Sequence, residues 1–194
     1  MKEFKIKYFL LRHGQTTHQI EDPKTIYFWP DGNPPYALTE LGKNQIQEKT
    51  LQLKDKNIDL IFSSDILRTK QTAQIVGQEL GLEPKFDQRL RDTNWGVFQG
   101  KSMEQAWAFY NHNMEKKFTI APSEGESWHD VKTRVIGLLK EIEEKYSQKN
   151  ILIVSHGDPL WLLEDWINGL NQEQSLERRK NGVPMKMGDL KEIN

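Results

Sequence analysis

The stretch Phe4-Lys-Ile-Lys-Tyr-Phe-Leu-Leu11, followed by Arg12-His13-Gly14, decides the fold of this chain. Its apolar residues first alternate with lysines and then run without interruption, which is typical of a strand that enters a buried parallel sheet. Ile151-Leu-Ile-Val154 has the same character and stops in the same way, at Ser155-His156-Gly157. The sequence therefore predicts two buried strands, each with a histidine and a glycine directly after its carboxyl end.

A third run with strand character, Ile58-Asp-Leu-Ile-Phe62, ends at Ser63-Ser64-Asp65. Between the strands, apolar residues recur at three- and four-residue spacing, which predicts helices. The longest such pattern predicts a helix with one apolar face, made by Val131, Val135, Leu138, Leu139, Ile142 and Tyr146. Strands that alternate with helices in this way favour a mainly parallel sheet covered on both faces.

Start and stop signals bound three further helices. Thr39 starts a helix from about Glu40 to Lys54, and Asp65 caps a helix that ends near Gly81. Asp158, with Pro159 after it, caps a helix that runs to Ile167 and stops at Asn168-Gly169. We expect an α/β fold, a three-layer α/β/α sandwich, with a C-terminal strand within 185–193.

The chain length favours one domain over residues 1–194, because 194 residues would crowd two. Two stretches do not follow the alternation of strands and helices. One, at about 20–37, is rich in proline and aromatic residues, and the other, at 93–125, has glycines and a proline around a short helical run. We expect both to be excursions over the sheet that line or cover the active site.

Composition excludes several classes of protein. With 27 Lys and Arg against 28 Asp and Glu, the chain has no global basic field for nucleic acid or an anionic membrane. The absence of cysteine excludes disulfide scaffolds, thiolate zinc sites and cysteine nucleophiles. No apolar run is long enough to span a bilayer, and the start lacks the apolar region of a signal peptide. We expect a cytoplasmic protein that binds a small molecule, as a monomer or a homodimer.

The strand ends concentrate groups that suit a phosphate. His13 and His156 lie at two of them, Arg12 precedes His13, and Arg68 lies just after the third. A single histidine is usually a surface or core residue, and a cation in the first turn of a helix is disfavoured by the helix dipole unless an anion sits beside it. Two guanidinium groups and two imidazoles from separate strand ends would match a tetrahedral dianion.

With these residues and their order, the chain resembles the histidine phosphatase superfamily, in its phosphoglycerate mutase-like branch. The resemblance runs from residue 5 to about 160 through six ordered blocks: Leu11-Arg12-His13-Gly14-Gln15-Thr16, Ala37-Leu38-Thr39-Glu40-Leu41-Gly42, Ser63 to Ala73, Leu90-Arg91-Asp92 with Gly96 and Gly100, Gly125-Glu126-Ser127, and Val154-Ser155-His156-Gly157.

The resemblance implies a role for each matching residue. His13 would attack phosphorus and carry a transient phosphohistidine, while Arg12, Arg68 and His156 would hold the phosphoryl oxygens. Further contacts with the substrate are implied for Thr16, Gln19 and Gly157, although Thr16 could equally cap a turn. The resemblance requires no metal and no cofactor.

The proton donor differs from the family pattern. Many members have a glutamate where this chain has Asp92, which can do the same acid–base work with a shorter reach. Asp92 could instead be a turn residue, and Glu126 is the first alternative as the donor. Gln19 also stands where an asparagine is frequent.

We expect hydrolysis of the phosphate monoester of a small metabolite through phospho-His13. Phosphoglycerate mutase-type transfer is the nearest rival, and it is disfavoured because only about 25 residues follow Gly169, which leaves little chain for a lid that excludes water. The sequence is also compatible with a phosphoryl-binding module without turnover and with a metal-dependent hydrolase.

Overall fold

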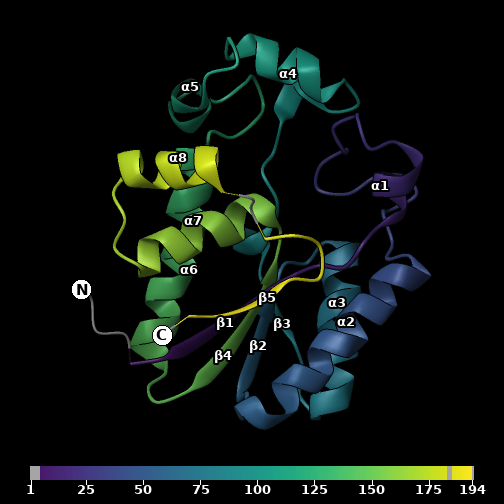
Figure 1. The fold of residues 1–194 in the computed structure, drawn as a ribbon, viewed down its shortest axis with the longest axis vertical. Coiled ribbons are helices and arrows are strands. Elements are labelled where there is room, and N and C mark those ends of the chain that lie inside the picture. The colour runs from purple at the N-terminus through teal and green to yellow at the C-terminus, as the bar shows by residue number, and fades with distance from the viewer. Residues whose placement is uncertain (1–4, 183–184, 194) are drawn as a thin grey trace.

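The computed structural model describes residues 5–182 and 185–193 and contains a five-stranded sheet. Its strands are β1 (Lys7–Arg12), β2 (Leu60–Ser63), β3 (Lys85–Phe86), β4 (Asn150–Ser155) and β5 (Leu190–Ile193), in the order β3-β2-β4-β1-β5 (Figure 1). Only β5 is antiparallel to its neighbour, β1. The mainly parallel sheet and the C-terminal strand are confirmed, whereas Phe4, where the first strand was expected to begin, lies outside the described residues.

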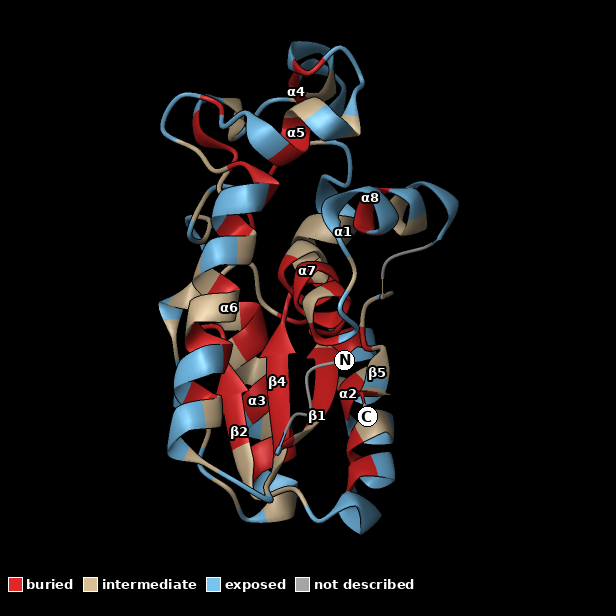
Figure 2. Ribbon diagram, turned by 90° about the vertical axis from the view of Figure 1, so that its left-hand side faces the viewer, coloured by how far each residue is buried: buried red, intermediate tan, exposed pale blue. Residues whose placement is uncertain are grey.

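Four helices cover the two faces of the sheet: α2 (Glu40–Leu53), α3 (Leu67–Leu80), α6 (Trp128–Lys145) and α7 (Gly157–Ile167). The sheet has a hydrophobic core on each face, and successive residues of β1 point into opposite cores. Phe9 and Leu11 pack with α2 and α3, whereas Tyr8 and Leu10 pack with α6 and α7. The three strands β1, β2 and β4 and the helix α7 are largely buried, while α6 buries one face only (Figure 2). The three-layer α/β/α architecture is therefore confirmed.

The helix boundaries predicted at Thr39 and Gly81 agree with the structure, whereas two predicted N-caps do not. Thr39 accepts the Gly42 N–H at 3.0 Å at the start of α2, and Gly81 ends α3 with φ of 68°. The two aspartate caps were wrong, because the N-cap position of α3 is Ile66 and that of α7 is His156, and neither side chain makes a capping hydrogen bond. Each aspartate has cationic partners elsewhere in the chain, Arg91 for Asp65 and Arg179 for Asp158.

The remaining helices lie beyond the carboxyl end of the sheet (Figure 1). They are α1 (Thr17–Glu21), α4 (Met103–Phe109), α5 (Met114–Thr119) and α8 (Gln172–Asn181), with 3₁₀ turns at Lys54–Lys56, Gln88–Leu90 and Gly96–Phe98. The segment with α4 has a core of its own, in which Trp95, Ala106 and Tyr110 pack with Ile26 of the N-terminal excursion. No helix in the part of the chain that the structure describes is long and apolar enough to cross a membrane.

The loop after β1 packs directly on the start of α2. A Cβ added to Gly42 would lie 2.1 Å from the Gln15 carbonyl oxygen, closer than real atoms approach. We expect Gly42→Ala to lower the free energy of unfolding by about 1–3 kcal/mol, because the backbone must move apart. Urea unfolding measures the change. Gly137→Ala is the matched control: it lies in the middle of α6 with open space around it, and it should raise stability by about 0.5–1 kcal/mol. Equal effects of the two variants would contradict this packing argument.

Candidate active site

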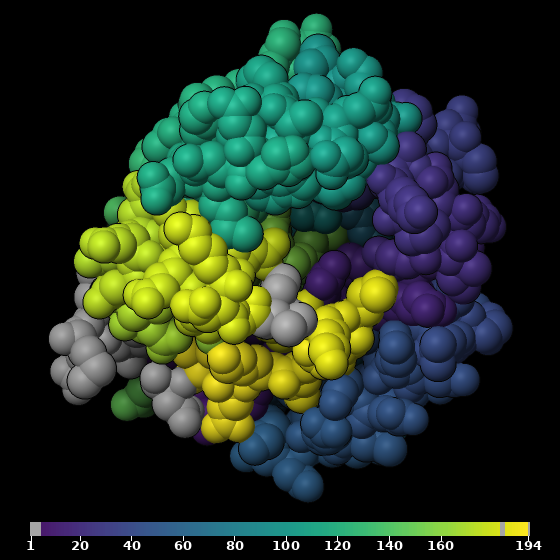
Figure 3. Space-filling model, turned by 45° about the horizontal axis from the view of Figure 1, so that its top comes forward, coloured from purple at the N-terminus to yellow at the C-terminus, as the bar shows by residue number. Residues whose placement is uncertain are grey.

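The carboxyl ends of β1, β4 and β2 bring His13, His156 and Ser64 together, as the strand order requires. The His13 backbone N–H donates to the Ser155 carbonyl at 3.2 Å, and the two imidazole rings lie 5.2 Å apart between centroids. The space-filling view shows a hollow over this place, bordered by the teal segment with α4, the purple N-terminal excursion and the yellow C-terminal segment (Figure 3).

His13 is 1% exposed and is held in one tautomer. Its Nδ1 lies 2.8 Å from the Gly14 carbonyl oxygen, which can only accept, so Nδ1 carries the proton and Nε2 keeps its lone pair. Burial, with Arg68 and Arg12 nearby, holds the pKa of His13 well below its ordinary value. His13 is therefore neutral at pH 7, as a nucleophile must be.

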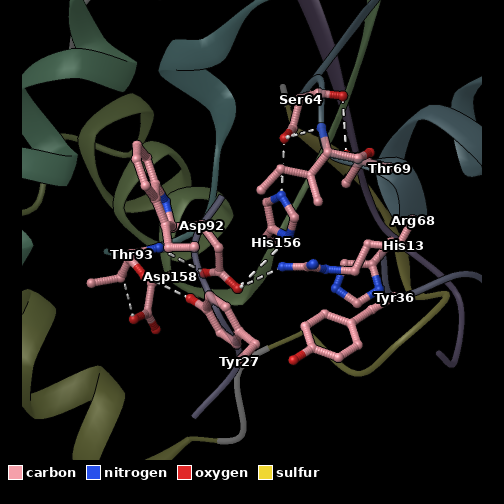
Figure 4. A network of polar contacts seen from close by, with 12 residues as sticks. His13, Tyr27, Tyr36, Ser64, Arg68, Thr69, Asp92, Thr93, His156 and Asp158 are labelled. Atoms are coloured by element: carbon pink, nitrogen blue, oxygen red, sulfur yellow. Dashed lines mark hydrogen bonds and ion pairs between the residues drawn. The ribbon is translucent and has the colours of Figure 1, made fainter. Parts of the chain in front are cut away.

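His156 is fully buried between a hydroxyl and a carboxylate (Figure 4). Its Nε2 lies 3.0 Å from Ser64 Oγ, and its Nδ1 lies 3.7 Å from Asp92 Oδ2 without a direct hydrogen bond. Burial and the neighbouring arginines also hold the pKa of His156 well below its ordinary value. A neutral ring with one nitrogen near the pocket can donate a hydrogen bond to an incoming oxygen.

The two arginines approach from different elements. Arg12 ends β1, and its Nη1 donates to the Met185 carbonyl at 2.7 Å. Arg68, in the first turn of α3, is 3% exposed, and its Nη1 is buried without a hydrogen-bond partner among the described residues. Both guanidinium groups are close enough to His13 to lower its pKa. The structure thus brings together the four residues whose positions at strand ends suggested a phosphate site.

Asp92 lies on the opposite side of His156 from Ser64 (Figure 4). Its Oδ1 accepts the Thr93 N–H at 3.0 Å, so Oδ2 faces Arg68 Nη2 at 3.5 Å and His156. Burial raises the pKa of Asp92, against the opposing effect of Arg68. This carboxyl group thus combines a fixed position in the pocket with a pKa raised above that of an ordinary aspartate, so it keeps its proton to higher pH, which suits a proton donor.

Glu126 has a different environment. Its Oε1 accepts from Arg134 Nε at 2.7 Å, and its Oε2 accepts from the Asn94 N–H at 2.9 Å and from Arg134 Nη2 at 3.1 Å. Arg134 also donates to the carbonyls of Arg89 and Asp92. The Glu126–Arg134 pair therefore anchors the segment that carries Asp92, and both Glu126 oxygens are already occupied.

Three other residues were expected to contact the substrate, and the structure gives Thr16 and Gln19 one environment and Gly157 another. Thr16 donates its hydroxyl to Gln19 Oε1 at 2.6 Å, and the two residues form a capping box at the start of α1. The capping role considered for Thr16 is thus present in the structure. Gly157 begins α7 beside Arg12, whose Cζ would lie 3.3 Å from an added Cβ. A side chain at this position would crowd the Arg12 guanidinium.

Several pocket residues were not predicted from the sequence. Asp158 accepts from Thr93 Oγ1 at 3.0 Å, Trp128 Nε1 at 2.7 Å and Arg179 Nη2 at 2.9 Å, which fixes a second carboxylate near Asp92. Its place directly after His156-Gly157 was a signal that could have been used. Tyr27, Asp31 and Tyr36 also face this site, but they carry no recognisable motif.

Within the described ranges, no group of three or more histidine, aspartate or glutamate side chains is placed to hold a metal ion. The arrangement offers a neutral imidazole nitrogen, two guanidinium groups, a second imidazole and a carboxyl group whose pKa is raised by burial. These groups can bind a tetrahedral anion, attack its central atom and protonate a departing oxygen.

Comparison with known proteins is consistent with this geometry. The family model described as histidine phosphatase superfamily (branch 1) matches residues 8–181. A curated relative from Escherichia coli O1:K1 / APEC, named probable phosphoglycerate mutase GpmB, is 31% identical over 173 residues, which are 85% of this chain and 76% of that protein.

Two solved structures cover most of the chain. The mycobacterial glucosyl-3-phosphoglycerate phosphatase is 26% identical with a TM-score of 0.79, over 97% of this chain and 89% of that one. Bacillus stearothermophilus YhfR is 25% identical with a TM-score of 0.78, over 97% and 91%.

Proposed function

The chain belongs to the histidine phosphatase superfamily (branch 1), and from that membership and the pocket geometry we propose that it hydrolyses phosphate monoesters of small metabolites through a phosphohistidine on His13. One observation carries the proposal: the hydrogen bond from His13 Nδ1 to the Gly14 carbonyl leaves Nε2 as the only ring nitrogen with a free lone pair. That nitrogen lies in a buried site with Arg12 and Arg68. A basic nitrogen among guanidinium groups suits attack on an anionic phosphoryl group.

The proposed reaction has two displacements at phosphorus. In the first, His13 Nε2 forms a bond to phosphorus, the ester P–O bond breaks, and Asp92 gives its proton to the departing oxygen. In the second, water attacks the phosphohistidine, Asp92 takes a proton from it, and the P–N bond breaks to release phosphate. Arg12, Arg68 and His156 neutralise the phosphoryl oxygens in both steps. Thr16, Gln19 and the backbone of Gly157 are proposed as further contacts with the phosphoryl group.

We propose further that the chain forms one domain whose excursions at about 20–37 and 93–125 border the pocket. In this proposal it works in the cytoplasm, without a metal or a cofactor, as a monomer or a homodimer. A hydrolase is favoured over a mutase by the phosphatase among its similar structures, although the curated relative is named a probable mutase. The mutase is therefore the second candidate function.

Phosphorus NMR with 3-phosphoglycerate separates the two reactions. We expect release of inorganic phosphate from this or another monoester in a panel of sugar phosphates and nucleotides, because the proposed reaction ends with the attack of water on phospho-His13. A bisphosphoglycerate primer should not change the product. Rapid formation of 2-phosphoglycerate with negligible free phosphate would establish the mutase instead. A parallel sample in excess chelator should keep its full rate, and loss of the rate there would favour a metal-dependent hydrolase.

A further inference from the structure

The pocket wall formed by residues 27–36, called the wall loop below, is tied to α3 by one carboxylate. Asp31 Oδ1 accepts the N–H groups of Gly32 at 3.1 Å and Tyr36 at 3.0 Å, which closes the loop on itself. Asp31 Oδ2 accepts the Leu67 N–H at 2.9 Å. Leu67 is the first residue of α3, and the cap residue of that helix, Ile66, provides no side-chain hydrogen bond. Asp31 therefore supplies the missing cap from a distant part of the chain.

The same carboxylate lies beside the phosphate-holding arginine. Arg68 follows Leu67 directly, and its Nη1 lies 3.9 Å from Asp31 Oδ1. Its Nη2 lies 3.5 Å from Asp92 Oδ2, and its guanidinium carbon lies 5.2 Å from the centre of the Tyr27 ring. The Arg68 guanidinium is thus placed between two carboxylates and over an aromatic ring.

The wall loop also packs on the segment that follows His13. The Tyr36 ring packs on His18, five residues after His13, with centroids 4.7 Å apart. Because Asp31 accepts the Tyr36 N–H, the position of this ring depends on the same carboxylate that holds the start of α3. The wall of the pocket and the first turn with Arg68 are consequently one connected unit.

We propose that Asp31 is a positioning residue for phosphate binding, which directs the Arg68 guanidinium into the pocket and fixes the wall loop against it. The inference rests on the proposed function only in taking this pocket as a phosphate site. A carboxylate near a bound dianion is unfavourable through its charge alone. Removal of that charge would tighten anion binding if charge were all that mattered, whereas loss of positioning weakens it. The two roles therefore differ in the sign of the effect.

Titration calorimetry with orthovanadate, a phosphate mimic, tests the sign without turnover. Asp31→Asn keeps an oxygen for the loop but presents an amide N–H to one partner, so it should weaken vanadate binding about tenfold, equivalent to about 1.4 kcal/mol. Asp31→Ala should weaken it at least as much. Asp59→Asn is the matched control, since Asp59 also accepts a backbone N–H and pairs with a cation, at the start of β2. It should leave vanadate affinity unchanged.

A double variant tests whether Asp31 acts through Arg68. Arg68→Gln alone should weaken vanadate binding strongly, and adding Asp31→Asn should then cause little further loss, because coupled residues are not additive. Unchanged or tighter binding by Asp31→Asn, or full additivity with Arg68→Gln, would overturn the proposal. Melting temperatures of all variants distinguish a local effect from general unfolding.

The outcomes for Asp31 and for the reaction are separable. If the wild-type chain binds vanadate but hydrolyses no monoester, the proposed function fails while the effect of Asp31→Asn on affinity still supports or contradicts positioning. If the wild type does not bind vanadate, both proposals fail.

Discussion

His13→Ala should abolish hydrolysis of phosphate monoesters, with a fall in kcat of about 10⁴-fold or more. The variant retains Arg12, Arg68 and His156 to bind the phosphoryl group, but it has no Nε2 to attack phosphorus, and loss of a covalent nucleophile leaves only binding and electrostatic effects. Release of phosphate from a nitrophenyl ester measures the loss. Vanadate should inhibit the wild type in competition with substrate.

Trapping the intermediate tests the assignment directly. Acid-sensitive, base-stable label should appear on His13 when the wild type is quenched during turnover of a labelled substrate. The chain has no cysteine, so no thiol can carry the label, and the label is located by mapping the modified residue. His156→Ala is the control: it should retain some labelling, because the role proposed for His156 is to bind phosphoryl oxygen and not to carry phosphate. Label on a serine or on His156 in the wild type would refute the assignment.

Asp92→Asn should slow alkyl phosphates about 10³-fold and a nitrophenyl phosphate by less than about tenfold. An alkoxide needs a proton as it leaves, whereas nitrophenolate leaves with little help, and general acid catalysis contributes about 10²–10⁴-fold. Steady-state kinetics on both substrate types measures the ratio. Glu126→Gln is the matched control, because Glu126 is paired with Arg134 and should influence both substrates equally. Equal losses on both substrates in Asp92→Asn would move the acid role elsewhere.

The pH profile provides a second measure of the same residue. The raised pKa of Asp92 means that its proton is kept to higher pH than in an ordinary aspartate and is lost as pH rises further. The lowered pKa of His13 means that the nucleophile stays unprotonated into the acid range. For an alkyl phosphate, kcat/KM should therefore fall on the alkaline side as Asp92 ionises. This alkaline fall should be absent in Asp92→Asn, and a profile with the same alkaline fall in the variant would assign it to another group.

The sequence predicted the parts of the fold that depend on local pattern. Continuous apolar runs located β1 and β4, and the residues just after those runs located His13 and His156, because parallel strands end at one edge. Thr39 and Gly81 marked helix ends through short-range backbone chemistry. These signals are all contained within a few neighbouring residues.

The errors and omissions arise from long-range contacts. Asp65 looked like a cap because nothing nearby in the sequence shows that Arg91 binds it instead. Asp31 could not be predicted, since its partners are Leu67 and Arg68, which lie in another element. The choice between Asp92 and Glu126 likewise depended on Arg134, whose side chain saturates Glu126 only once α6 packs against the pocket.

The strand order also determines when the nucleophile can be assembled during synthesis. β1 is made before the other strands, yet its neighbours in the sheet are β4 and β5, which are made more than a hundred residues later. Until then β1 is an apolar strand with two open edges, the kind of segment that aggregates or binds holding chaperones. Pairing of such distant segments is intrinsically slow. We therefore expect a nascent chain arrested before Asn150 to be inactive and insoluble. His13 can take its place beside His156 only after β4 has been synthesised.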